Sequence, residues 1–130
     1  MSQENVERAR KGNDAFRRAD WDALAANLDP HILLRTDARW PEQYIYGREA
    51  AIDFYRGGWE SFGPDVRIEE IMDLGDRLLL RNCWTVRGQQ SGIGGELRWS
   101  ELSTLREGLT ILIEFFLQHE FALKAVGLEG

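Results

Sequence analysis

The chain has 130 residues, of which 43% are hydrophobic and 29% charged, as is typical of one globular domain with a substantial core. Its formal net charge of -6 disfavours nucleic acid as a partner, because an acidic protein repels phosphate backbones. The single cysteine excludes an intrachain disulfide, and no apolar run approaches the ~20 residues of a membrane span, so we expect one cytoplasmic domain over residues 1–130 with no membrane partner.

The first half of the chain is predicted to be mainly helical. A first helix is expected over residues 2–18, with Asn13 as the polar member of its apolar stripe. Arg8 and its basic neighbours alternate with acidic residues, which is typical of a solvated helix face. A second helix is predicted over residues 21–28 and a third over residues 48–62.

Strands dominate the rest of the chain. They are predicted at residues 31–37, 44–46, 66–74, 77–87, 96–107 and 109–117. Residues 88–95 are predicted as a flexible hairpin loop, and a short helix is predicted at residues 119–128. Segregated helices and antiparallel strands indicate an α+β domain and not a parallel, doubly wound sheet.

Two of these strands indicate a pocket and a partner. In the strand over residues 77–87, one face is almost wholly apolar and is the predicted pocket face: Leu78, Leu80, Asn82, Trp84 and Val86. The strand over residues 109–117 is apolar on both faces, whereas a strand with one wet face would alternate. We therefore expect helices and a pocket on one side of the sheet and a partner subunit on the other.

The sequence lacks the motifs of common cofactor and metal sites. The glycines of residues 91–95 precede a strand, but a phosphate loop requires a helix there. His31 and His119 are far apart, and no metal-ligand spacing occurs, so we expect neither a metal nor a cofactor.

The candidate site residues are polar side chains on apolar surfaces. The clearest are Asn13, Thr36, Asn82 and Glu114, followed by Asp37 and Glu101. A carboxyl group in an apolar cavity has a raised pKa and can act as a general acid or base near neutrality. The alternative is that Asp37 lies in a loop and that the two glutamates pair with arginines or with a partner subunit.

Four short segments carry a resemblance to a known family. They are ADWDAL at residues 19–24, YGREAAI at 46–52, DLGDR at 73–77 and ALKAVGL at 122–128. In this order and spacing they resemble the nuclear transport factor 2-like superfamily, and most closely its SnoaL-like (polyketide cyclase-like) branch. The similarity extends over nearly the whole chain.

The resemblance implies a cone-shaped α+β fold of the cystatin-like kind. Three N-terminal helices would pack in the concave face of a strongly curved, mostly antiparallel mixed sheet, with an apolar pocket between them. It also implies a homodimer through the outer sheet face, which agrees with the last strand being apolar on both faces.

The resemblance does not select a reaction, since the branch includes steroid isomerases, polyketide cyclases, epoxide hydrolases and dehydratases. The tyrosine of the steroid isomerases falls at Gly12 here, and their general base falls at Thr36, one residue before Asp37. The polyketide cyclases use an acid on a late strand, for which this chain offers Glu101 and Glu114.

Two hypotheses of function remain open. The first is a cofactor-independent enzyme acting on a small apolar substrate, with Asp37, Glu101 or Glu114 as the base and with Asn13, Asn82 or Tyr55 polarising an oxygen. The second is a non-catalytic binding module or dimeric scaffold. Both require a ligand pocket, for which the expected lining residues are Asn13, Phe16, Leu34, Thr36, Tyr55, Trp59, Leu80, Asn82, Trp84 and Phe116.

Overall fold

The computed structural model describes residues 2–37, 40–87 and 94–128. The elements follow the order α1 (Ser2–Arg17), α2 (Trp21–Ala25), β1 (Leu28–Arg35), β2 (Tyr44–Tyr46), α3 (Arg48–Phe62), β3 (Val66–Asp73), β4 (Arg77–Arg87), β5 (Gly94–Arg106), β6 (Leu109–Phe116) and α4 (His119–Ala125). Within these ranges no helix is long and apolar enough to cross a lipid bilayer. The hairpin loop predicted at residues 88–95 falls largely outside the described residues, and β5 already begins at Gly94.

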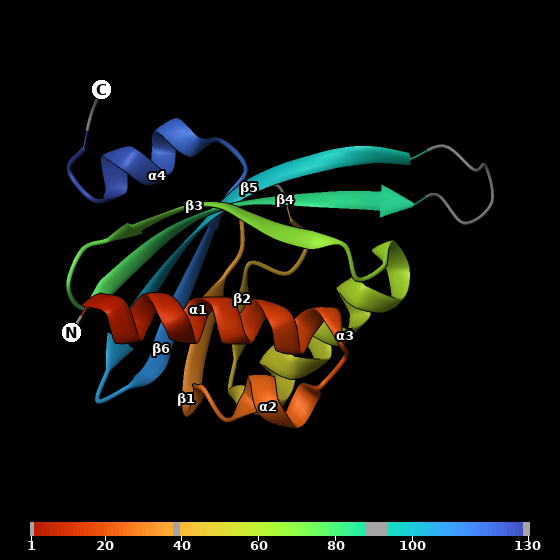
Figure 1. Ribbon diagram of the computed structural model, residues 1–130, viewed down its shortest axis with the longest axis horizontal. Coiled ribbons are helices and arrows are strands. Elements are labelled where there is room, and N and C mark those ends of the chain that lie inside the picture. The colour runs from red at the N-terminus through yellow and green to blue at the C-terminus, as the bar shows by residue number, and fades with distance from the viewer. Residues whose placement is uncertain (1, 38–39, 88–93, 129–130) are drawn as a thin grey trace.

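The six strands form one curved sheet in the order β2-β1-β6-β5-β4-β3. β1 and β6 run parallel, and the other neighbouring pairs are antiparallel. Figure 1 shows α1, α2 and α3 on one side of the sheet and α4 on the other. The predicted α+β fold, with three helices in the concave face of a mixed sheet, is confirmed.

The junction between α2 and β1 differs from the prediction. The helix ends at Ala25 and the strand begins at Leu28, whereas the helix was expected to reach residue 28. The cause is pairing with β6: Thr110 N donates to the carbonyl of Asn27 at 2.9 Å, and Leu28 lies opposite Thr110. A long-range ladder therefore overrides the local helical pattern.

The main core lies between the concave face and the helices. It comprises Leu28, Ile32, Leu34, Ile45, Ala51, Ile52 and Ile113. A second cluster, Leu79, Leu102 and Ala122, joins the outer face of the sheet to α4, where Phe116 also packs. Part of the apolar outer face of β6 is thus covered by a helix of the same chain.

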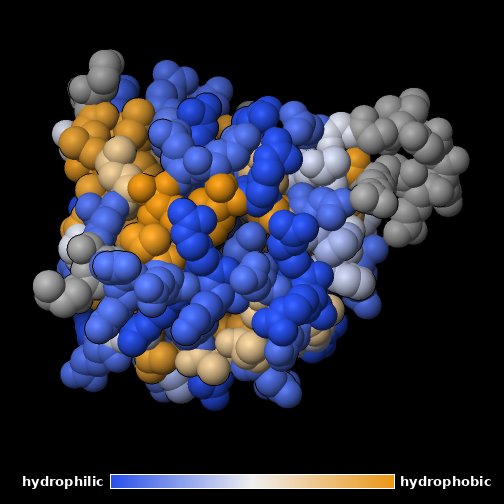
Figure 2. All heavy atoms as spheres, viewed as in Figure 1, coloured by the Kyte–Doolittle hydropathy of each residue, from blue (hydrophilic) through white to orange (hydrophobic). Residues whose placement is uncertain are grey.

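Figure 2 shows how polarity is distributed on one face of the molecule. Polar side chains cover the exposed surface of α1, and an apolar band runs over β3 toward α4. Met72 of β3, 38% exposed, and Phe121 of α4, 50% exposed, are two of the large apolar residues that remain accessible. The apolar stripe of α1 is therefore turned inward, toward the sheet.

Candidate functional site

A cavity of about 300 Å³ lies between the three N-terminal helices and the concave face of the sheet. Its size suits a small molecule, and its lining is mostly aliphatic and aromatic. Large apolar residues that line the cavity and are also exposed mark its mouth: Trp40, Phe62, Leu97 and Leu117.

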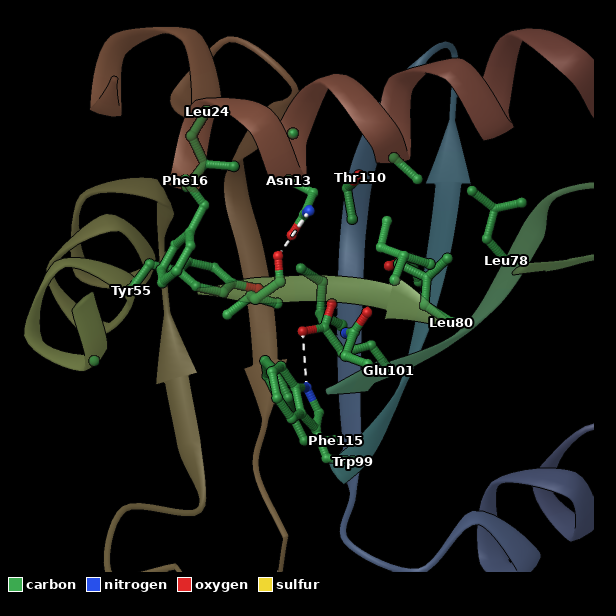
Figure 3. A pocket seen from close by; sticks show the side chains of 18 of the residues that line it. Asn13, Phe16, Leu24, Tyr55, Leu78, Leu80, Trp99, Glu101, Thr110 and Phe115 are labelled. Atoms are coloured by element: carbon green, nitrogen blue, oxygen red, sulfur yellow. Dashed lines mark hydrogen bonds between the residues drawn. The ribbon is translucent and has the colours of Figure 1, made fainter. Parts of the chain in front are cut away.

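Glu101 projects into this cavity from β5. Side chains alternate along a strand, so Trp99, Glu101 and Ser103 share the cavity face. The indole Nε1 of Trp99 donates to Oε1 of Glu101 at 3.0 Å (Figure 3). Burial raises the pKa of the Glu101 carboxyl to about 7, and the Trp99 hydrogen bond offsets only part of this rise. Glu101 keeps some accessible surface, and it lines the cavity.

Tyr55 approaches from the opposite wall. Figure 3 shows its side chain extending from α3 toward the centre of the cavity, into which Glu101 projects from β5. Burial, and then the charge of Glu101, raise the pKa of the Tyr55 phenol well above its ordinary value. The phenol therefore stays protonated at neutral pH and can donate a hydrogen bond.

Two asparagines add polar atoms to the cavity wall. Nδ2 of Asn13 donates to the carbonyl of Val66 at 3.1 Å, which fixes the amide against β3. Asn82 is 4% exposed and lies opposite Trp99 on the neighbouring strand. Within the described residues its Oδ1 has no hydrogen-bond partner. A ligand group that donates a hydrogen bond to this oxygen would therefore gain binding energy.

Most of the residues predicted to contact a ligand do line the cavity. They are Asn13, Phe16, Thr36, Tyr55, Leu80, Asn82 and Trp84. Asp37 lines it too, near the mouth, where its Oδ2 accepts from the backbone N–H of Leu117 at 3.2 Å. Of the three predicted carboxylates, Asp37 and Glu101 line the cavity, and Glu101 does so from the middle of β5.

The other four predicted residues do not line the cavity. Leu34 is wholly buried in the main core. The Trp59 ring packs against Trp21 at 6.5 Å, and its Nε1 donates to the carbonyl of Arg17 at 3.4 Å. Phe116 packs in the cluster beneath α4, and Glu114 forms an ion pair with Arg35.

A bulge explains the placement of Glu114 and Phe116. Thr104 of β5 lies opposite Leu112, but the next residue, Leu105, lies opposite Thr110. The register shift reverses the alternation of β6. Residues after the shift therefore face the opposite side of the sheet from the side that a regular strand would give them. Phe115 lines the cavity in place of Phe116.

Trp99, Arg8 and Asn5 are among the lining residues that sequence reasoning missed. Trp99 could have been found, because it lies two positions before Glu101 on the same predicted strand. Arg8 and Asn5 precede Gly12 by four and seven residues on α1, a spacing that places all three on one helix face. In the described part of the chain, no group of His, Cys, Asp and Glu side chains is arranged to hold a metal ion.

The chain is a small α+β domain with a mostly apolar cavity between its helices and its sheet. The model of the SnoaL-like domain family matches residues 9–112, so the chain belongs to that family. No curated protein sequence matches the chain significantly.

Solved structures share the whole architecture. A protein from Jannaschia sp. CCS1, described as a SnoaL-like polyketide cyclase, has a TM-score of 0.78 and 22% identity, covering 89% of this chain and 86% of that chain. A nuclear transport factor 2-like protein from Burkholderia pseudomallei has a TM-score of 0.75 and 18% identity, covering 98% of this chain and 99% of that chain. TerC, co-crystallised with polyporic acid, has a TM-score of 0.73 and 17% identity, covering 94% of this chain and 96% of that chain. At these identities the likeness shows the fold alone.

Proposed function

We propose that the protein is a cofactor-independent enzyme in which Glu101 transfers a proton to or from a small, largely apolar carbonyl compound. The buried position of Glu101 in the cavity carries this proposal. With a pKa of about 7, its protonated and ionised forms coexist near neutral pH. Such a group can take a proton and return it without a large energetic penalty in either direction.

The surrounding side chains suit enolisation. Ionised Glu101 removes a proton from the carbon next to the substrate carbonyl. The electron pair of that C–H bond forms a C=C bond, and the π pair of the carbonyl moves to its oxygen. The Tyr55 phenol, which stays protonated, donates a hydrogen bond to the developing negative charge. Return of the proton from Glu101 to another carbon completes an isomerisation. In a cyclisation, the enolate carbon attacks a second carbonyl within the substrate, and the oxygen of that carbonyl takes the proton from Glu101.

Hydrogen exchange tests the proposal directly. In D₂O, the wild-type chain is expected to speed exchange of the C–H protons next to the carbonyl in a panel of cyclic ketones and β-diketones, followed by proton NMR. Glu101→Gln should abolish this exchange, because the amide cannot accept the proton. Glu114→Gln is the matched control, since Glu114 lies with Arg35 outside the cavity.

The outcome separates the two kinds of function. Exchange by Glu101→Gln at the wild-type rate would contradict the assignment of Glu101. Binding of the panel compounds without exchange, seen as a change in tryptophan fluorescence, would favour a non-catalytic ligand-binding module. Trp84 and Trp99 line the cavity and would report such binding.

We also infer a homodimer formed through the outer face of β1, β2 and β6. Leu33 lies between Tyr46 on one neighbouring strand and Leu112 on the other, and Tyr46 is 67% exposed. The outer face of β3 to β5 is less suited, because its charges already pair with one another: Arg67 Nη2 lies 3.0 Å from Glu96 and Arg98 Nε 3.0 Å from Glu69.

Light scattering at micromolar concentration checks this interface. The wild-type chain is expected to have the mass of a dimer, and Tyr46→Glu that of a monomer, because the charge would lie unpaired in the apolar contact. Lys11→Glu, on the exposed surface of α1, should remain dimeric. A monomeric wild-type chain would refute the inference.

A further inference from the structure

One part of the cavity wall carries a positive charge. Arg8 of α1 lines the cavity together with Gly108 of the β5–β6 turn, and its Nη1 donates to the Gly108 carbonyl at 2.7 Å. Gly108 has a φ of +81°, and a Cβ at this position would lie 2.6 Å from Nη1 of Arg8. The glycine thus allows the turn and the guanidinium to approach closely.

The Arg8 guanidinium has no acidic partner in the described part of the chain. Its one hydrogen bond there goes to a neutral carbonyl, and no carboxylate lies within 4.0 Å of its nitrogens. A guanidinium has five N–H donors, so most of its donors remain available. The two acidic residues of the described cavity lining lie elsewhere, Asp37 near the mouth and Glu101 in the middle of β5.

The arrangement separates this charge from Glu101 along the cavity. Glu101 and Leu105 both line the cavity on β5, and four residues of strand span roughly 13 Å. Gly108, which contacts Arg8, follows shortly after Leu105. Figure 3 shows that the cavity wall extends from Tyr55 on one side to Leu78 on the other. Asn5 of α1 and Thr110 of β6 line the cavity as well and add neutral polar groups.

We propose that Arg8 anchors the carboxylate of an elongated, mainly apolar acid. The planar fork of a guanidinium matches a carboxylate in a bidentate geometry. The apolar body of the ligand would fill the cavity between Arg8 and the aromatic mouth. This proposal rests on the proposed function only where it places the reacting carbonyl of the substrate next to Glu101. The binding of the acid by Arg8 does not depend on the proposed reaction.

Paired probes test the anchor. Decanoate and decan-1-ol share an apolar body and differ in charge, and their binding at pH 6 can be followed by the fluorescence of Trp84 and Trp99. The wild-type chain is expected to bind decanoate at least about tenfold more tightly than the alcohol, the effect of one charge-assisted hydrogen-bonded pair. The formal net charge of -6 opposes this preference, so a preference for the anion must come from a local group.

The variants assign the preference to one residue. Arg8→Gln should lose the preference for decanoate and keep its affinity for decan-1-ol. Arg10→Gln makes the same change of charge on the exposed surface of the same helix and should behave as wild type. Arg8→Lys, which keeps the charge without the fork, should fall between the two.

Two results would overturn the proposal: equal affinity of the wild-type chain for the two probes, or an unchanged preference in Arg8→Gln. The comparison of decanoate with decan-1-ol uses the wild-type chain alone. It can therefore refute the proposal even if Arg8→Gln fails to fold. Neither result affects the hydrogen exchange expected of Glu101. The anchor at Arg8 and the acid–base role of Glu101 can therefore be refuted independently.

Discussion

At pH 8.5, Glu101→Gln is expected to be more stable than the wild-type chain, by about 3 kcal/mol in the free energy of unfolding. The pKa of Glu101 is raised from 4.5 to about 7 in the folded state, so this state binds the proton more tightly than the unfolded chain. As the pH rises through this window, the folded state must ionise a carboxyl in apolar surroundings, and the wild-type chain loses stability. Glutamine carries no such charge and keeps an oxygen that accepts from Trp99.

Urea denaturation at several pH values measures this effect. Below about pH 4.5 the carboxyl is protonated in both states, so the gap between Glu101→Gln and wild type should close there. Glu60→Gln, at an exposed position of α3, should show no comparable dependence on pH. A gap that stays constant from pH 5 to pH 8.5 would contradict the raised pKa.

This loss of stability has a consequence for function. Residues placed for chemistry often lower the stability of the fold that holds them, and their replacement then stabilises the protein while removing activity. A variant at Glu101 that gains stability at high pH and also loses hydrogen exchange would connect the two effects to one buried carboxyl.

The sequence predicted the cavity face of β4 because nothing interrupts its alternation. Leu78, Leu80, Asn82 and Trp84 line the cavity, as expected, whereas Val86, predicted on the same face, does not. The reason is the pairing of β4 with β5, which continues from Arg77 to Arg87 without a register shift. Where a strand is regular, a period of two residues is enough to divide its side chains between the faces.

β6 could not be assigned in the same way. Its bulge depends on the register that it adopts against β5, and this register is a property of the assembled sheet. Phe115 and Phe116 are adjacent and chemically identical, so no local feature indicates which of them faces the cavity. The same shift places Glu114 beside Arg35 on the outer face.

The choice among the three acidic candidates also required the fold. Asp37, Glu101 and Glu114 all lie in or next to predicted strands, and the sequence offers no measure of how deeply each is buried. The structure places them in different surroundings. Asp37 lies near the mouth of the cavity, Glu101 lines its apolar interior, and Glu114 forms an ion pair with Arg35. Arg8 was missed for a related reason, since alternating charges on α1 resemble a solvated face even where one of them turns inward.

Gly57→Ala and Gly58→Ala are expected to differ by about 1–3 kcal/mol in the free energy of unfolding, with Gly58→Ala the less stable. Both glycines lie inside α3, where alanine favours the helix by up to about 1 kcal/mol, so this gain is common to the two variants. A Cβ at position 57 meets nothing within 4 Å, whereas a Cβ at position 58 would lie 2.8 Å from Cη2 of Trp84. The difference therefore isolates the contact between α3 and the indole.

Trp84 has little freedom to move away from such a methyl group. Its Nε1 donates to the carbonyl of Gly63 at 3.0 Å, and its ring packs edge-on against Phe16 at 5.7 Å and Phe62 at 5.5 Å. Relief of the clash would turn the indole into the cavity or lift α3 from the sheet. Urea denaturation of both variants gives the stability difference, and equal stabilities would contradict the close packing. If the indole turns inward, it narrows the cavity. Gly58→Ala should then bind decan-1-ol more weakly than Gly57→Ala.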